Sequence, residues 1–195
     1  MHLVFVFGPP AVGKMTVGRE IATRTGYKLL HNHMTVEPVL DIFPFGSPPF
    51  TRLVSEFRRR ILEEAIAAEL PGLVFTMVWG LELPEDRGLV ASYVDLVEAA
   101  GGHVTFVELY AELAERLARN RTELRLAEKR SKRDVDFSHG NVLELERYVM
   151  NTRPGVRTEA SAVLDGRPHL RIDNTHLSAA DVATQVVSSF RRPVT

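Results

Sequence analysis

The segment GPPAVGKMT, residues 8 to 16, restricts the fold of this chain more than any other feature. An apolar run from Leu3 to Phe7 precedes it, and the helix-like pattern KMTVGREIATRTG leaves it. Between a strand and a helix, successive loop N–H groups and the positive helix end form a concave anion site, to which Lys14 adds a mobile charge. The segment predicts a phosphate-binding loop; the alternative is a glycine-rich turn with an exposed lysine.

The spacing of the loop differs in one position from the Walker A motif G-x-x-x-x-G-K-[ST]. Met15 stands where the motif has a hydroxyl residue, and Thr16 follows it. Thr16 is therefore the candidate for bonding phosphate or Mg²⁺. The residues expected to surround the phosphates are Gly8, Pro9, Pro10, Ala11, Val12, Gly13, Lys14, Met15 and Thr16.

Short apolar runs rich in Val, Leu, Ile and Phe recur along the chain and are typical of strands covered on both faces. They are Leu3 to Phe7, Lys28 to His31, Leu73 to Val78, His103 to Leu109 and His169 to Ile172. Helix-like segments separate these runs, which predicts right-handed crossovers and a mainly parallel sheet with ligands beyond its carboxyl ends. One segment has an apolar stripe at helical spacing, formed by Phe50, Leu53, Val54, Phe57, Ile61, Leu62, Ala65 and Ile66.

Composition fits a single globular domain spanning residues 1–195. The 195 residues are 45% hydrophobic and 25% charged, with a net charge of −1, which argues against attraction of the whole surface to nucleic acid. There is no cysteine, and no stretch reaches eighteen apolar residues. We expect a cytoplasmic protein with no membrane partner, acting as a monomer or homodimer.

The loop resembles that of adenylate kinases, G-x-P-G-x-G-K-G-T, which also places one residue between Lys and Thr, and it is similar to the loops of shikimate and gluconate kinases. Ala11 and Met15 depart from the adenylate kinase pattern, since both replace glycines. The resemblance implies a three-layer α/β fold of the P-loop NTPase type, with five parallel strands ordered 2-3-1-4-5 and a helical lid at about residues 120–140. It also implies ATP and Mg²⁺ as cofactors.

A second resemblance lies in RLARNRTELRLAEKRSKRDVDFS, residues 116 to 138. It is similar to the lid of the adenylate kinase group, whose R-x-D-D stretch resembles Arg133, Asp134 and Asp136, and whose R-L-x-x-Y ending resembles Arg147 with Tyr148. The resemblance implies phosphate-clamping arginines. Arg121 and Arg125 are similar in position to lid-entry arginines that stack on adenine or meet the phosphoryl group. The alternative is a solvated helix with internal salt bridges.

The phosphate acceptor is expected beyond the second strand, where His31, Asn32 and His33 stand. A neutral histidine can accept a hydroxyl proton, but the pair can equally be structural. A zinc site would need a third ligand such as Asp41 or His139.

On the next helix, Phe57-Arg58 resembles the acceptor helix of shikimate kinases. The candidates for binding an anionic acceptor are therefore Arg52 and Arg58, while Arg59 and Arg60 are expected to face solvent. Trp79, after the third strand, can stack on an acceptor or belong to the core.

Near the C-terminus, Asn174 and Thr175 follow the last strand, at a turn whose backbone touches adenine in the kinases named above. Ser178 and Asp181 resemble a capping box for the last helix. No Asp ends the second or third strand, so Glu82 is the available substitute for an acid that holds Mg²⁺ through water.

The sequence therefore predicts a P-loop kinase that moves the γ-phosphoryl group of MgATP to a hydroxyl or phosphate of a small metabolite. Two alternatives remain: a regulatory ATP- or GTP-binding protein without an acceptor, and an RNA-end kinase that uses EKRSKR as a backbone patch.

Overall fold

The computed structural model describes residues 1–120, 140 and 142–190. The strands are β1 (His2–Phe7), β2 (Lys28–His31), β3 (Gly72–Met77), β4 (His103–Tyr110) and β5 (His169–Asp173). The helices are α1 (Lys14–Thr25), α2 (His33–Leu40), α3 (Pro48–Ala67), α4 (Pro84–Ala99), α5 (Leu113–Arg119), α8 (Ser161–Leu164) and α9 (Ala179–Ser189). The expected lid at about 120–140 lies almost entirely outside the described residues.

The five strands form one parallel sheet in the order β2-β3-β1-β4-β5, which confirms the predicted order. β1 lies in the centre, paired with β3 on one side and β4 on the other. Because all strands run the same way, the loop after β1 and the ends of β2 and β3 share one edge of the sheet. A ligand site at that edge can draw on residues far apart in the sequence.

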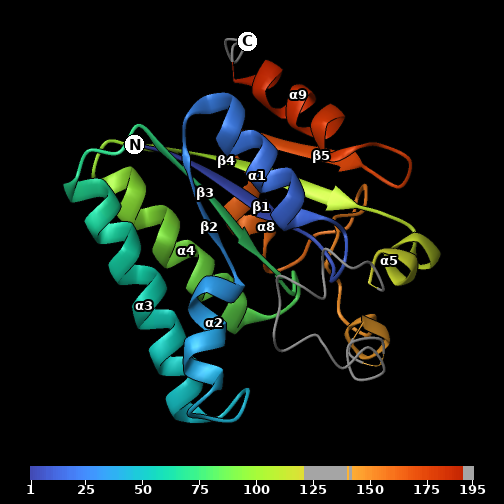
Figure 1. Ribbon diagram of the computed structural model, residues 1–195, viewed down its shortest axis with the longest axis horizontal. Helices are drawn as coiled ribbons and strands as arrows, with labels where there is room; N and C mark the ends of the chain where they lie inside the picture. The colour runs from blue at the N-terminus through green and yellow to red at the C-terminus, as the bar shows by residue number, and fades with distance from the viewer. Residues whose placement is uncertain (121–139, 141, 191–195) are drawn as a thin grey trace.

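Helices cover both faces of the sheet, so the fold has three layers (Figure 1). Along β1, Leu3, Phe5 and Phe7 pack in one core with α3, α4 and α8, whereas Val4 and Val6 pack in a second core with α1 and α9. This alternation follows from the two-residue period of a strand. It explains why β1 is apolar at every position after His2.

The face of α3 that packs inward differs from the predicted stripe. Phe50, Val54, Leu62 and Ala65 are buried as expected, but Leu53 and Phe57 are exposed and Arg58 is buried in their place. The prediction for Leu53 and Phe57 was wrong because apolar spacing alone does not show which side of the stripe meets the core. A buried arginine becomes acceptable here because other elements supply it with hydrogen bonds.

The last helix begins as predicted. The Ser178 hydroxyl caps α9 by accepting a hydrogen bond from the Asp181 N–H at 3.1 Å. In the described part of the chain, no helix is both long enough and apolar enough to cross a membrane.

Candidate phosphoryl-transfer site

The loop between β1 and α1 requires glycine at its first position. Gly8 has a φ of +139°, and a Cβ there would lie 2.3 Å from the carbonyl oxygen of Leu109 on β4. Gly13, the residue before α1, has a φ of +102°. Ala11 also takes a left-handed conformation, with a φ of +62°, although it is not glycine. These glycines and the left-handed turn form a tight bend, with α1 beginning directly behind it, which fits an anion such as a phosphate group.

Lys14 lies at the start of α1 and folds over this bend. Its Nζ donates to the carbonyl oxygens of Gly8 at 2.6 Å and Pro9 at 2.8 Å. The ammonium group is thus held above the loop and faces the cavity described below. A flexible four-carbon stem lets such a group exchange carbonyl oxygens for phosphate oxygens.

Two side chains hold the loop from behind. The Asn174 Nδ2 donates to the Val12 carbonyl oxygen at 2.8 Å, and Arg119 Nη1 donates to the same oxygen at 3.2 Å. Arg119 also donates to the carbonyl oxygens of Asn174 at 2.8 Å and Thr175 at 3.0 Å. The turn after β5 therefore supports the loop through Asn174 and Arg119. Contact of Asn174 and Thr175 with a nucleobase stays a prediction.

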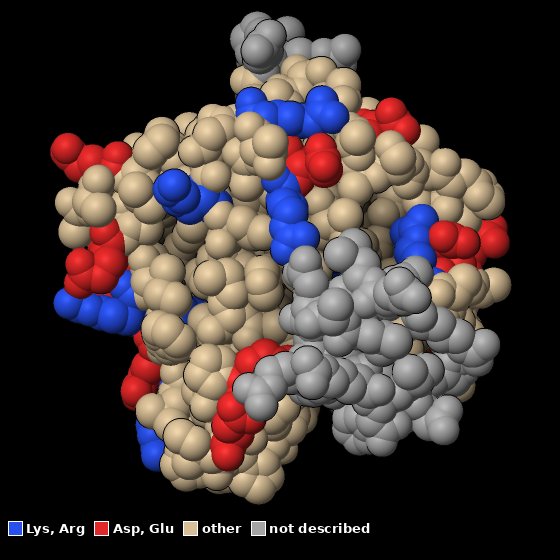
Figure 2. All heavy atoms as spheres, in the orientation of Figure 1, with Lys and Arg blue, Asp and Glu red and all other residues tan. Residues whose placement is uncertain are grey.

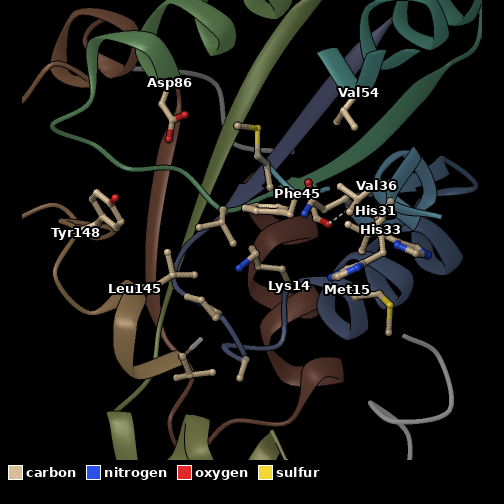
Figure 3. Close-up of a pocket in the computed structure, with 18 of the residues that line it drawn as sticks. Lys14, Met15, His31, His33, Val36, Phe45, Val54, Asp86, Leu145 and Tyr148 are labelled. Carbon is tan, nitrogen blue, oxygen red and sulfur yellow. Dashed lines mark hydrogen bonds between the residues drawn. The ribbon is translucent and has the colours of Figure 1, made fainter. Parts of the chain in front are cut away.

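The loop opens into a cavity of about 1090 Å³. Its floor is the loop and the start of α1, including Lys14, Met15 and Thr16. In Figure 3, Val36 and Val54 lie on the side of His31, and Leu145 and Tyr148 lie on the opposite side of Lys14. The cavity can therefore hold a phosphate chain at the loop with a second molecule beside it.

The end of β2 contributes the predicted acceptor residues, and all three line the cavity: His31, Asn32 and His33. Asn32 Oδ1 accepts a hydrogen bond from Arg58 Nη2, and Arg58 Nε donates to Thr35 Oγ1 at 3.1 Å. His33 Nδ1 lies 3.0 Å from Glu37 Oε1, one turn along α2. The structure thus brings β2, α2 and α3 together through Arg58.

Arg58 and Asp86 bring two opposite charges to the lining of the cavity. Burial lowers the pKa of Arg58, an effect that the nearby Tyr93 hydroxyl and Asp86 oppose. Burial likewise raises the pKa of Asp86, although the Gly80 N–H donates to its Oδ2 at 2.8 Å. Among the described residues, no carboxylate lies within ion-pair distance of Arg58. Asp86 is a candidate for orienting an acceptor hydroxyl or taking its proton.

Two predicted acceptor residues do not reach the cavity. Trp79 is fully buried and packs against Phe5, Phe7 and Phe106, so it belongs to the core and cannot stack on an acceptor. Arg52 is exposed on α3 and does not line the cavity. Six residues further along the helix, Arg58 takes the inward position.

The metal predictions have different outcomes. Thr16 lines the cavity next to Lys14, so its role toward Mg²⁺ stays a prediction. The Glu82 carboxylate accepts hydrogen bonds from the Val149 N–H at 2.9 Å and 3.1 Å and is outside the cavity lining, so it does not serve as the acid. The residues that the structure describes contain no group of three or more metal-ligating side chains. His139, one proposed zinc ligand, lies outside them.

Of the expected phosphate-clamping arginines, three lie outside the described residues: Arg121, Arg125 and Arg133. Arg147 lines the cavity, lies 4.8 Å above the Tyr148 ring and donates to its hydroxyl at 3.0 Å. Arg116 is buried and pairs with Glu146 at 2.8 Å. Arg116 therefore links α5 to the segment that carries Arg147.

Sequence reasoning missed Arg119 and Asp86 as site residues. The signal for Arg119 was present, because it belongs to the cluster of arginines after β4, but its partners Val12 and Asn174 are distant in sequence. Asp86 follows Pro84 at the start of α4, where an acidic residue ordinarily indicates a stabilised helix end. Only the position of α4 beside the cavity shows the further option.

Comparisons with known proteins give the fold but no close relative. No protein-family model matches the sequence, and no curated protein matches it. Among solved structures, shikimate kinase from Bacteroides thetaiotaomicron is 14% identical, with a TM-score of 0.57 over 97% of this chain and 98% of that chain. The Mycobacterium tuberculosis APS kinase, in complex with AMPPNP and APS, is 18% identical, with a TM-score of 0.56 over 98% of both chains. A gluconokinase from Sinorhizobium meliloti is 15% identical, with a TM-score of 0.54 over 96% of this chain and 90% of that chain. The chain therefore has the fold of the P-loop kinases.

Proposed function

We propose that this protein is an ATP-dependent phosphotransferase that moves the γ-phosphoryl group of MgATP to a small metabolite. One observation carries the proposal: the Lys14 loop and the end of β2 open into a single cavity large enough for two molecules. Solved structures with this fold include a shikimate kinase, a gluconokinase and an APS kinase bound to AMPPNP and APS, which supports nucleotide use.

The residues of the chain divide the work. Backbone N–H groups of the loop would bind the phosphate chain, and Lys14 would follow the transferring group. Arg147 lines the same cavity and would add positive charge where the transferring oxygens become more negative. His31 or Asp86 would orient the acceptor hydroxyl or accept its proton.

Thr16 would hold Mg²⁺ together with phosphate oxygens and water, because this ion keeps much of its hydration shell. When bound, Mg²⁺ neutralises charge on the phosphates and favours departure of ADP. The described cavity also offers the Asp86 carboxylate, the only Asp or Glu besides Glu144 in its described lining.

A screen of small hydroxyl and phosphate compounds for ADP release tests the proposal. We expect at least one compound to raise ADP release well above the rate in water, and Lys14→Ala to abolish the increase. Lys28→Ala, an exposed lysine at the far end of β2, is the matched control and should behave as wild type. Tight ATP binding without turnover for any compound would favour the regulatory nucleotide-binding alternative.

The face of the molecule in Figure 2 gives no support to the nucleic-acid alternative, and the EKRSKR segment lies outside the described residues. Figure 2 shows Lys and Arg interspersed with Asp and Glu on this face, without one continuous basic patch among the coloured residues. Binding to a polyanion through a basic patch would fall steeply with added salt. Retention of an RNA strand in low salt and its loss in high salt would support that alternative.

A further inference from the structure

The wall of the cavity beside His31 is mainly apolar. α2 contributes Val36 and Leu40, the following loop contributes Phe45, and α3 contributes Phe50 and Val54. Val36, Phe50 and Val54 form a small core of their own, with Leu40 packed against it. This wall is thus a built surface of the fold and not a collection of isolated side chains.

Phe45 is the exposed part of this wall. Its side chain lines the cavity, yet the residue is 77% exposed, and its ring lies 5.1 Å from the ring of Phe50. Covering a large exposed aromatic side chain with an apolar group removes apolar surface from water, which lowers the free energy of the complex. The position of Phe45 at the cavity mouth therefore favours a ligand with an apolar surface.

Two charged side chains that line the cavity, Arg58 and Asp86, are already engaged by the protein. Arg58, 6% exposed, donates to Thr35 and Asn32, and Asp86 accepts from the Gly80 N–H. The remaining polar groups of α3 at the wall are the hydroxyls of Thr51 and Ser55. A compound with many hydroxyl groups would bury several of them against apolar carbon, and each buried polar group without a partner is costly.

We propose that the acceptor is an alcohol with a mainly apolar body, aromatic or branched aliphatic, and not a polyol or a sugar acid. This inference rests on the proposed kinase function. The body would cover Val36, Phe45 and Val54, with its hydroxyl directed toward Lys14 and His31 (Figure 3). The hydroxyl oxygen bonds to the γ-phosphorus, the bond from that phosphorus to the β,γ-bridging oxygen breaks, and ADP leaves. The hydroxyl proton passes to His31 or Asp86 and from there to solvent.

The test compares two panels of compounds at equal concentrations. The apolar panel contains 2-phenylethanol, 4-phenylbutanol and cyclohexylmethanol, and the polar panel contains glycerol, myo-inositol and gluconate. We measure ADP release with MgATP, and separately the binding of each compound by calorimetry in the presence of Mg²⁺ and AMPPNP. We expect the apolar panel to bind more tightly and to turn over faster than the polar panel.

Two variants of one loop sharpen the result. Phe45→Ala should raise the KM and Kd of the apolar alcohols by about tenfold, since a change in apolar contact of one group is worth roughly 10–200-fold, and should leave the KM of ATP unchanged. Ile42→Ala is the matched control, because Ile42 is 72% exposed in the same loop but does not line the cavity. Both side chains are exposed, so both variants should fold.

The outcomes separate the inference from the proposed function. Turnover of the polar panel alone would overturn the inference and leave the kinase function standing. Binding of the apolar panel, weakened by Phe45→Ala but without ADP release, would support the inferred ligand class and contradict the kinase function. Binding of neither panel, or an equal effect of Phe45→Ala and Ile42→Ala, would overturn the inference.

Discussion

The side-chain amide of Asn174 donates a hydrogen bond to the carbonyl oxygen of Val12 at 2.8 Å. The bond joins the turn after β5 to the loop after β1, and both residues are buried. It fixes one carbonyl of the loop and so restrains the backbone of the loop. We therefore expect Asn174 to affect phosphate binding through the loop backbone.

Asn174→Ala should weaken ATP binding by roughly tenfold, because a buried carbonyl loses a hydrogen bond worth about 0.5–1.5 kcal/mol and the loop becomes less ordered. Calorimetric titration with MgATP measures the change. Gln185→Ala, which removes an exposed amide from α9, should leave the Kd unchanged. Equal affinities for Asn174→Ala and wild type would show that the loop holds its shape without this bond.

Gly8 and Gly88 should respond in opposite ways to the same substitution. A Cβ on Gly8 would lie 2.3 Å from the Leu109 carbonyl oxygen, so Gly8→Ala should distort the loop and abolish detectable ATP binding. Gly88 lies in α4 with no atom within 4 Å of an added Cβ, so Gly88→Ala should stabilise the protein by up to about 1 kcal/mol. Thermal unfolding and MgATP titration measure both variants. Normal ATP binding by Gly8→Ala would contradict the close approach of β1 and β4 at the loop.

His2 should make the protein less stable in mild acid. Burial and the stacked His103 ring, 4.1 Å away, lower the pKa of His2 from 6.5 to about 4. Folding therefore opposes protonation of His2, so its contribution is intact above pH 6.5 and is lost as the pH falls toward 4. The loss approaches about 3 kcal/mol at the lower limit, at 1.36 kcal/mol per pKa unit.

Urea unfolding at several pH values between 7 and 4 measures this loss. His2→Gln should flatten the dependence, because glutamine does not titrate, whereas His176→Gln at an exposed position should retain it. An unchanged slope in His2→Gln would show that other groups cause the acid sensitivity.

Glu108 is a buried carboxylate that joins β4 to the segment that holds Asn151 and Thr152. It accepts hydrogen bonds from Asn151, from the N–H and hydroxyl of Thr152, and from Arg171, and it lies 3.0 Å from His169 Nε2. Burial alone would raise the pKa of Glu108, but the hydrogen bonds with His169, Thr152 and Asn151 outweigh this effect and lower the pKa. The stability it provides is present above its unfolded pKa and is lost as the pH falls through its lower folded pKa.

Glu108→Gln should destabilise the protein by about 3 kcal/mol. The substitution removes the negative charge that attracts the surrounding donors, and the NH2 group of the glutamine amide then faces some of those donors. The exposed Glu64→Gln, on α3, should change stability by less than about 0.5 kcal/mol. Chemical unfolding at pH 7 compares the two. A similar small effect at both positions would mean that the buried cluster rearranges to accept the amide.

The sheet could be predicted closely from the sequence, and the cavity only in part. Each predicted strand ends within one residue of the observed one, because strands covered on both faces are marked by continuous apolar runs. The glycine-rich loop could be predicted equally well, since its glycines and Lys14 lie within seven consecutive residues, 8 to 14. The sequence did not show that Arg58 turns inward while Leu53 and Phe57 turn outward. The oxygens that accept hydrogen bonds from Arg58 belong to Asn32 and Thr35, which are distant from it in the sequence.

The same limit explains Trp79 and Asp86. Trp79 follows a strand end, where either a core or a ligand contact suits an aromatic residue, and the packing of Phe5, Phe7 and Phe106 decides for the core. Asp86 reaches the cavity only because α4 begins beside the end of β3. Local patterns give element type and loop chemistry, whereas contacts between elements decide which side chains meet a ligand.

Titration of the protein with MgATP by calorimetry, side by side with Lys14→Ala, tests the central claim most directly. We expect saturable binding of one nucleotide per chain, weakened at least tenfold in Lys14→Ala, while Lys28→Ala binds as wild type does. Absence of heat with both ATP and GTP, or equal binding by Lys14→Ala and wild type, would contradict a phosphate site at this loop.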